Sequence, residues 1–192
     1  MCRMRLIALV LFALMSVTSA TAQTTAYDLT VTADNTKRNG SPWDGVPGLR
    51  ESAANFNSKP DIAVCIIEPD KKPNCLWRPQ GRRLLSVCQN SHTCKFENVT
   101  LPPLPFGLLF IDIDVRRHDV IDSVILTGNA TTAGESGVDR ALRAALATLT
   151  PAISEDAAER ELRRTKTVPL QQCAVTPDCR LTQSQFNLRR RE

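Results

Sequence analysis

Six short β-type segments lie between Tyr27 and Thr127, and this succession constrains the fold more than any other feature. They are "YDLTVTA", "DIAVCIIE", "RRLLSVC", "TCKFENV", "PFGLLFIDI" and "DVIDSVIL". Clusters of Pro, Gly and Asn separate them, and no periodic segment of helical length interrupts them. This pattern predicts an antiparallel β-sandwich. The third and fourth segments flank a turn and are expected to form a hairpin. The nearly continuous apolar fifth segment is expected to lie centrally in its sheet.

The pattern changes at residues 128–136, which form a predicted flexible linker. Apolar residues then recur at the spacing of one helix face, at Val138, Leu142, Ala145 and Leu149. Pro151 ends this helix, and Ser154 is a typical N-cap for a second, mostly charged surface helix. We therefore expect residues 137–192 to form a short helical C-terminal extension that packs outside the sandwich.

The first 22 residues have the pattern of a secretory signal peptide. A short basic start, "MCRMR", precedes ten apolar residues, and a tail of small residues ends at Ala22. Because a bilayer span takes about 20 apolar residues, we expect cleavage after Ala22 rather than membrane anchoring. The mature chain is then expected to have no transmembrane segment and to be secreted or periplasmic.

The net charge of the chain does not favour a nucleic-acid partner. The net charge of +4 falls to +2 when Arg3 and Arg5 leave with the signal peptide. This weak balance gives no indication of nucleic-acid binding. The basic run from Arg189 to Arg191 is most simply a solvated chain end.

Six cysteines remain after the expected cleavage, and an even number in an exported chain indicates disulfides. The short, turn-rich spacers favour local pairs. The predicted pairs are Cys88–Cys94, Cys173–Cys179 and Cys65–Cys75. Zinc is the competing interpretation because His92 lies between two of these cysteines, but the sequence has no C-x-x-C pair and only two histidines.

An unusual group of carboxylates follows the apolar fifth segment. Asp112 and Asp114 end it, and Asp119 opens the next segment. Like charges this close repel unless a positive group lies among them. The spacing does not fit an EF-hand, because Arg116 stands where that loop needs an acidic or amide residue. His118 is a candidate general base, but nothing in the sequence supplies it with a nucleophile, so we expect no enzyme.

This D-x-D followed by a further Asp resembles the third loop of C2 domains. The opening segment "YDLTVTA" resembles their first strand, and "SKPDIAVCI" places Asp61 where the family often reads S-D-P-Y-V. "NGSPWDG" resembles a first loop that supplies Asp44, with Asp34 as its substitute, and "FENVTLPPLPFGLLFIDIDV" resembles the approach to the third loop. The gap between Asp44 and Asp61 is longer than usual in the family, and the cysteines are foreign to cytosolic C2 domains.

The resemblance implies a C2-like β-sandwich over residues 23–127 with calcium as its cofactor. The implied metal ligands are Asp44, Asp61, Asp112, Asp114 and Asp119. Calcium takes six to eight oxygen ligands from flexible loops, and alternation along a strand puts Asp112 and Asp114 on one side of it. We expect the five carboxylates to gather at one end of the sandwich.

Two functions follow as expectations. In the first, an exported C2-like module binds calcium and docks to an anionic phospholipid surface or a protein partner, with Arg116 and Arg117 at the tip of the third loop as surface contacts. In the second, a metal-free, disulfide-stapled β-sandwich acts as an inhibitor or a protein-binding adaptor. The effect of calcium on stability separates the two.

Overall fold

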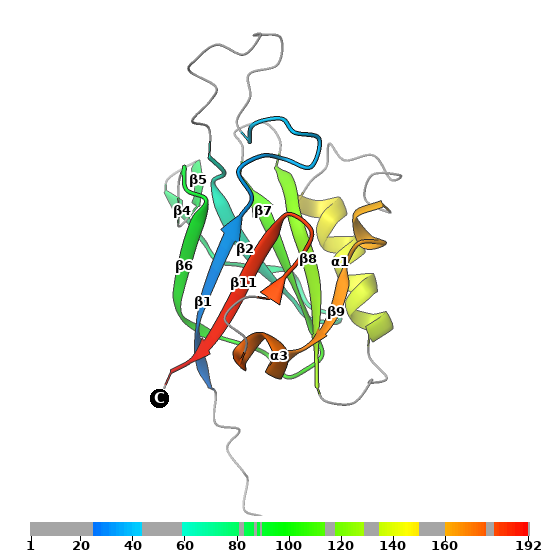
Figure 1. The fold of residues 1–192 in the computed structure, drawn as a ribbon. Coiled ribbons are helices and arrows are strands. Elements are labelled where there is room, and N and C mark those ends of the chain that lie inside the picture. The colour runs from blue at the N-terminus through cyan, green and yellow to red at the C-terminus, as the bar shows by residue number, and fades with distance from the viewer. Residues whose placement is uncertain are drawn as a thin grey trace, which may run out of the picture.

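Two β-sheets pack face to face as a sandwich in the computed structural model of this chain (Figure 1). The structure describes residues 25–43, 59–80, 83–86, 88, 90–113, 118–128, 135–149, 160–175 and 179–191. The sequence-based expectation of a mainly β sandwich is therefore confirmed.

The first sheet has four antiparallel strands in the order β10-β11-β1-β6. Its strands are β1 (Ala26–Ala33), β6 (Thr93–Thr100), β10 (Cys179–Arg180) and β11 (Ser184–Arg190). The first and the last long strands of the described chain are neighbours, because Tyr27 pairs with Arg190 and Ala33 with Ser184.

The second sheet has five strands in the order β3-β2-β7-β8-β9. Its strands are β2 (Ile62–Ile67), β3 (Asn74–Cys75), β7 (Phe106–Asp112), β8 (Asp119–Thr127) and β9 (Lys166–Pro169). This sheet is mixed, since β9 runs parallel to β8 and the other pairs are antiparallel. The strand β7 lies in the middle, as its apolar sequence predicts.

The apolar sequence of β7 has a direct cause in its surroundings. Every residue of the strand is buried. Phe106, Leu108 and Phe110 face the first sheet, where they meet Leu29 and Phe186 among others. Leu109 and Ile111 face the opposite side, in a second apolar cluster. A strand covered on both faces loses the alternation of polar and apolar residues.

The helix α1 (Glu135–Leu149) provides that second cover. Its apolar stripe of Val138, Leu142, Ala145 and Leu146 packs on the outer face of the second sheet. Gly107 allows this close approach: a Cβ atom there would lie 3.3 Å from side-chain atoms of Val138 and Leu142. The expectation that this helix packs outside the sandwich is confirmed.

Two expectations are wrong. The region after residue 137 is not only a helical extension, because β9, β10 and β11 complete both sheets and α3 (Leu170–Val175) is a single short helix. The predicted hairpin of "RRLLSVC" with "TCKFENV" does not form. Instead, β5 (Arg83–Ser86) pairs with β4 (Trp77–Gln80) in a separate ribbon, and β6 pairs with β1. The predicted second helix is described only at residues 160–162.

All three predicted disulfides are confirmed. Cys65–Cys75 joins β2 to β3, Cys88–Cys94 joins the chain before β6 to β6 itself, and Cys173–Cys179 joins α3 to β10. Zinc therefore has no cysteine ligands in the described part of the chain. Each bridge closes a short loop, for which a stabilisation of about 2–3 kcal/mol is typical.

Candidate functional site

The predicted site residues lie at one end of the sandwich, which we call the loop end. It is the end at which β1 and β7 finish and β2, β6, β8 and β11 begin, uppermost in Figure 1. Asp61 directly precedes β2, Asp112 ends β7 and Asp119 opens β8. Asp112 lies opposite Asp119 in the pairing of β7 with β8. These three carboxylates therefore share one end, as expected from the sequence.

Asp112 serves as a backbone acceptor inside the fold. Its side chain is fully buried, and Oδ1 accepts a hydrogen bond of 2.7 Å from the backbone N–H of Asp61. In return, the backbone N–H of Ile113 donates to the carbonyl oxygen of Asp61 at 3.0 Å. The ends of β7 and β2 are thus connected by a side-chain and a main-chain contact.

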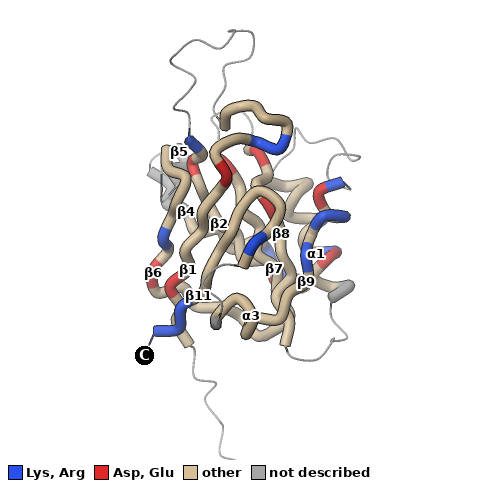
Figure 2. Tube along the Cα trace, viewed as in Figure 1, with Lys and Arg blue, Asp and Glu red and all other residues tan. Residues whose placement is uncertain are grey.

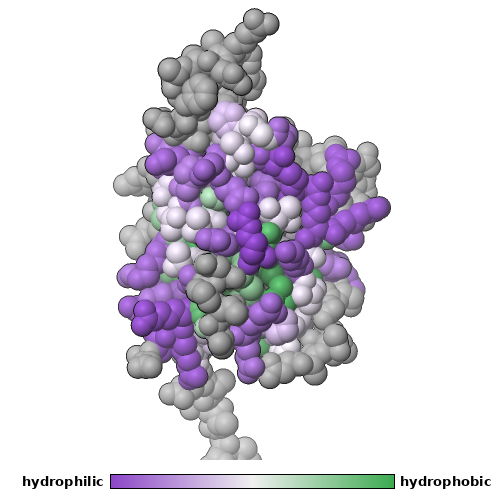
Figure 3. Space-filling model, viewed as in Figure 1, coloured by the Kyte–Doolittle hydropathy of each residue, from purple (hydrophilic) through white to green (hydrophobic). Residues whose placement is uncertain are grey.

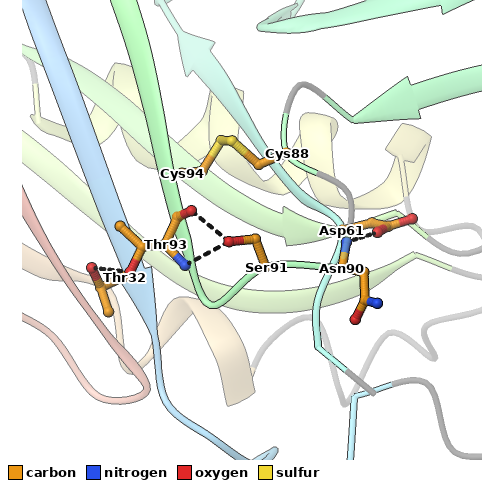
Figure 4. Close-up of a disulfide and its surroundings, with 7 residues drawn as sticks. All are labelled: Thr32, Asp61, Cys88, Asn90, Ser91, Thr93 and Cys94. Carbon is orange, nitrogen blue, oxygen red and sulfur yellow. Dashed lines mark hydrogen bonds between the residues drawn. A yellow bond between two sulfur atoms is a disulfide. The ribbon is translucent and has the colours of Figure 1, made fainter. Parts of the chain in front are cut away.

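Asp61 connects this pair to the loop before β6 (Figure 4). Its Oδ1 accepts a hydrogen bond of 2.6 Å from the backbone N–H of Asn90. Ser91 donates its N–H to the carbonyl oxygen of Pro60 at 3.0 Å, and Cys88–Cys94 closes the same loop covalently. Several independent contacts therefore fix the two loops to each other.

Ser91 also covers the outer edge of β6. Its hydroxyl donates to the carbonyl oxygen of Thr93 at 2.7 Å and accepts from the N–H of Thr93 at 3.3 Å (Figure 4). Farther along the strand, Asn98 has a φ of 57° at an irregularity of the β1–β6 pairing. Both features oppose the addition of another strand at this edge.

Asp119 has a positive partner within the protein. Its carboxylate forms an ion pair with the ammonium group of Lys37, from the loop that follows β1. The ammonium group lies 5.8 Å from the ring centroid of Trp43, whose indole N–H donates to the carbonyl oxygen of Asp34 at 2.8 Å. Lys37 is thus a positive group that offsets part of the repulsion expected among the clustered carboxylates.

Asp122 is a site residue that the sequence-based prediction missed. It lies in β8, is 4% exposed, and accepts hydrogen bonds from the N–H of Gln183 at 2.6 Å and the hydroxyl of Ser184 at 2.8 Å. Burial raises the pKa of the Asp122 carboxyl, against the lowering effect of these bonds and of Arg38. A signal was present in the sequence, because Asp122 is an acidic residue in the interior of the mostly apolar strand β8.

Arg38 connects Asp122 to a further carboxylate. One terminal nitrogen lies 3.9 Å from Oδ1 of Asp122, and the other donates to Oε1 of Glu161 at 3.1 Å. Arg164 donates to the same Oε1 at 3.0 Å. Burial raises the pKa of the Glu161 carboxyl, and the positive charge of Arg38 opposes this shift. Figure 2 shows acidic and basic residues close together at the loop end.

A bidentate ion pair connects two segments of the first sheet at the loop end. Both terminal nitrogens of Arg180 donate to the Asp34 carboxylate at 2.8 Å. This contact raises the pKa of the Arg180 guanidinium. The backbone N–H of Asp34 also donates to the carbonyl oxygen of Gln183 at 2.8 Å. The turn between β10 and β11 is therefore fixed to the loop after β1.

Asp44, Asp114, Arg116 and Arg117 lie outside the described residues. Among the residues that the structure does describe, no group of three or more His, Cys, Asp or Glu side chains is arranged to hold a metal ion. His118 is half-buried, and this burial lowers the pKa of its imidazole against the opposing charge of Asp119.

Two hollows are lined by described residues. One of about 190 Å³ lies at the loop end, between the loop after β1, the start of β8 and residues 161–164. A groove of about 600 Å³ lies elsewhere, between β3 and β6. Lys95, on this groove, forms an ion pair with Glu97 at 2.9 Å. The smaller hollow is the one that adjoins the predicted site.

Comparison with known proteins gives no identification: no family model, curated protein or solved structure matches the chain. The described helices include none that has the length and apolar character needed to cross a membrane. The function has to be inferred from the loop end itself.

Proposed function

We propose that this chain is an exported binding module, with a C2-like, disulfide-stapled β-sandwich whose loop end recognises a protein partner without a metal. The observation that carries the proposal is that each of the three described carboxylates already has a partner within the protein. Asp112 accepts from a backbone N–H, Asp61 accepts from another, and Asp119 pairs with Lys37. Each carboxylate is directed at a different donor of the protein.

The contacts among the described residues of the loop end support a role in recognition. Its segments are connected by Cys88–Cys94, by the Arg180–Asp34 ion pair and by hydrogen bonds between loops. Loops held in one geometry lose little entropy when a partner binds, so more of the contact energy contributes to affinity. Figure 3 shows a mostly hydrophilic surface around the loop end, which suits a polar, specific contact.

The disulfides and the N-terminal pattern support export. Disulfides persist in oxidising compartments and are rare in the cytosol, and the chain forms three. Together with the signal-like residues 1–22, they favour a secreted or periplasmic location. Mass spectrometry of the mature protein, with its N-terminus expected at Gln23, tests this part.

Site-specific photocrosslinking tests the recognition end. A photoreactive residue at exposed Asn39 or Lys59 lies at the loop end, and one at exposed Thr100 lies at the opposite end of β6. We expect the same discrete adduct from Asn39 and Lys59, and none from Thr100, in the native exported fraction. Equal adducts from all three positions would contradict recognition through the loop end.

Calcium binding is the second candidate, and one observation favours it. Asp61, Asp112 and Asp119 occupy adjacent backbone positions at the ends of three neighbouring strands, and Asp114 follows in sequence. In C2 domains generally, bound calcium bridges to anionic phospholipid head groups. On this proposal, vesicles that contain phosphatidylserine would sediment the protein with calcium and not with a chelator, and Arg116 and Arg117 would contribute surface contacts.

A calcium titration separates the two candidates. If calcium binds, a concentration of 100 times the dissociation constant adds about 2.7 kcal/mol to the free energy of unfolding. The double change Asp112→Asn, Asp114→Asn would abolish that gain. Calorimetry that gives no heat, together with an unchanged melting temperature at millimolar calcium, would leave the metal-free proposal standing.

A further inference from the structure

The hollow of about 190 Å³ at the loop end has a positively charged lining. Three of its described side chains are cationic, Lys37, Arg38 and Arg164, and two are carboxylates, Asp119 and Glu161. This volume lies below the roughly 300–1,000 Å³ that is typical of pockets for drug-sized ligands. It suits a small polar group rather than an apolar side chain or a drug-sized ligand.

The two guanidinium groups converge on a single acceptor. Arg38 and Arg164 both donate to Oε1 of Glu161, at 3.1 and 3.0 Å. A guanidinium carries several N–H donors in a planar fork that matches two oxygens of one anion. Each of these forks therefore uses one hydrogen bond to Glu161, and the second terminal nitrogen of Arg38 also lies 3.9 Å from Oδ1 of Asp122. The N–H groups of the two forks that do not contact these carboxylates are suited to a second, external oxyanion.

The protein holds the cations of this hollow in place. Lys37 is fixed between Asp119 and the Trp43 ring. Its backbone N–H donates to the carbonyl oxygen of Ser41, and its own carbonyl oxygen accepts from Gly40, both at 2.8 Å. Because the turn that carries Lys37 and Arg38 is hydrogen-bonded to itself, an incoming anion meets a preorganised set of donors.

We propose that this hollow is an oxyanion-binding site, in which Arg38 and Arg164 receive a carboxylate or a phosphate group. The inference rests on the proposed function and deepens it, because it names the chemistry that the loop end recognises. An acidic side chain of a protein partner and a free phosphate both present anionic acceptor oxygens, in planar and tetrahedral arrangements respectively. The experiment below distinguishes these two sources.

The carboxylates around the hollow give the site a pH dependence. Glu161 faces Arg38, Arg164 and Arg160, and Asp122 lies behind it. Asp122 in turn faces Arg38, Arg180 and the donors of the β10–β11 turn. Burial raises the pKa of both carboxyls, so they become protonated at a higher pH than ordinary carboxyls do. Their protonation removes negative charge from the surroundings of the hollow. Anion affinity should therefore increase with acidification.

NMR titration of the full-length chain tests the site. Inorganic phosphate, acetate and a doubly blocked glutamate are added separately at constant ionic strength, with chloride as the reference anion. We expect saturable shifts at the Arg38 side-chain N–H and at the Gln183 backbone amide, which both line the hollow. Saturation by phosphate alone indicates a phosphate ligand, and saturation by acetate and glutamate indicates an acidic side chain.

A pair of matched variants provides the control. Arg164→Gln should weaken binding by about tenfold or more, because it removes one charge-assisted donor set. Arg140→Gln changes an exposed arginine on α1, away from the hollow, and should leave binding unchanged. Both variants should melt near the wild-type temperature. A loss of anion binding in Arg164→Gln alone would therefore indicate that the anion binds in this hollow.

Two results would overturn the proposal. Shifts that grow linearly without saturation would indicate an adventitious ion only. An equal loss in both variants would indicate general screening of a basic surface. If crosslinks still form at Asn39 while no anion saturates the hollow, the recognition end remains supported and only the oxyanion site is lost.

Discussion

The fully buried Asp112 offers the sharpest test of how the loop end is held. Asp112→Ala removes the acceptor of the Asp61 N–H, a hydrogen bond of 2.7 Å. A buried donor left without its acceptor costs about 1–3 kcal/mol. In a chain of this size, each kcal/mol lowers the melting temperature by about 2–4 °C. A loss of about 2 kcal/mol therefore predicts unfolding about 4–8 °C below the wild type.

The assay is thermal unfolding in a chelator and again in millimolar calcium. We expect the same loss in both solutions, since the hydrogen bond needs no metal. Asp112→Asn keeps an acceptor oxygen and should lose less than Asp112→Ala. Asp139→Asn, at an exposed position of α1, is the control and should stay within about 0.5 kcal/mol of wild type.

The result has a clear refutation. If Asp112→Ala melts with the wild type in the chelator, the buried hydrogen bond does not stabilise the loop end. If the loss appears only with calcium, Asp112 acts as a metal ligand and the calcium candidate replaces the metal-free one.

Three further changes test separate parts of the structure. Gly107→Ala should cost about 1–3 kcal/mol by overpacking against α1; chemical denaturation measures this, and an unchanged midpoint would mean that the helix shifts at little cost. Because the folded pKa of Asp122 lies above its ordinary value of 3.8, the folded state binds more protons than the unfolded state between pH 3.8 and the folded pKa. Stability should then fall as the pH rises through the folded pKa, and Asp122→Asn should flatten this slope in denaturation measured across pH; an unaltered slope would assign it to other groups. Replacing Cys88 and Cys94 together by Ser should cost about 2–3 kcal/mol and speed hydrogen exchange at Asn90; unchanged exchange would show that hydrogen bonds alone hold the loop.

Local pattern was enough to predict the elements that depend on near neighbours. The alternation in β1, the apolar run of β7 and the stripe of α1 each reflect which faces are covered. The disulfides were predictable because short spacers limit which cysteines can meet. In each of these cases the information lies within a few residues of the element.

The strand β11 was not predicted because its pairing is distant in sequence. Phe186 and Leu188 alternate with polar residues, but the run is short and ends in charged residues. Its partner β1 lies more than 150 residues earlier, and no local pattern reveals such a neighbour. The parallel pairing of β9 with β8 was missed for the same reason.

The carboxylates illustrate a similar limit at the candidate site. The resemblance to C2 loops implied that Asp61, Asp112 and Asp119 share one end of the sandwich. It did not reveal Lys37, which reaches Asp119 across 82 positions. Nor did it reveal that Asp112 accepts a backbone hydrogen bond. The positions were visible in the pattern, but the partners depended on the tertiary fold.

The pairing of β1 with β11 has a consequence for how the chain is made. Synthesis runs from the N-terminus, so β1 emerges long before residues 184–190 exist. Until then, one edge of β1 lacks its partner, and Leu29 and Val31 lack Leu188 and Phe186 as neighbours in the core. Unpaired edges and exposed apolar faces favour aggregation during folding. We therefore expect the first sheet to be completed only after residues 184–190 have been synthesised.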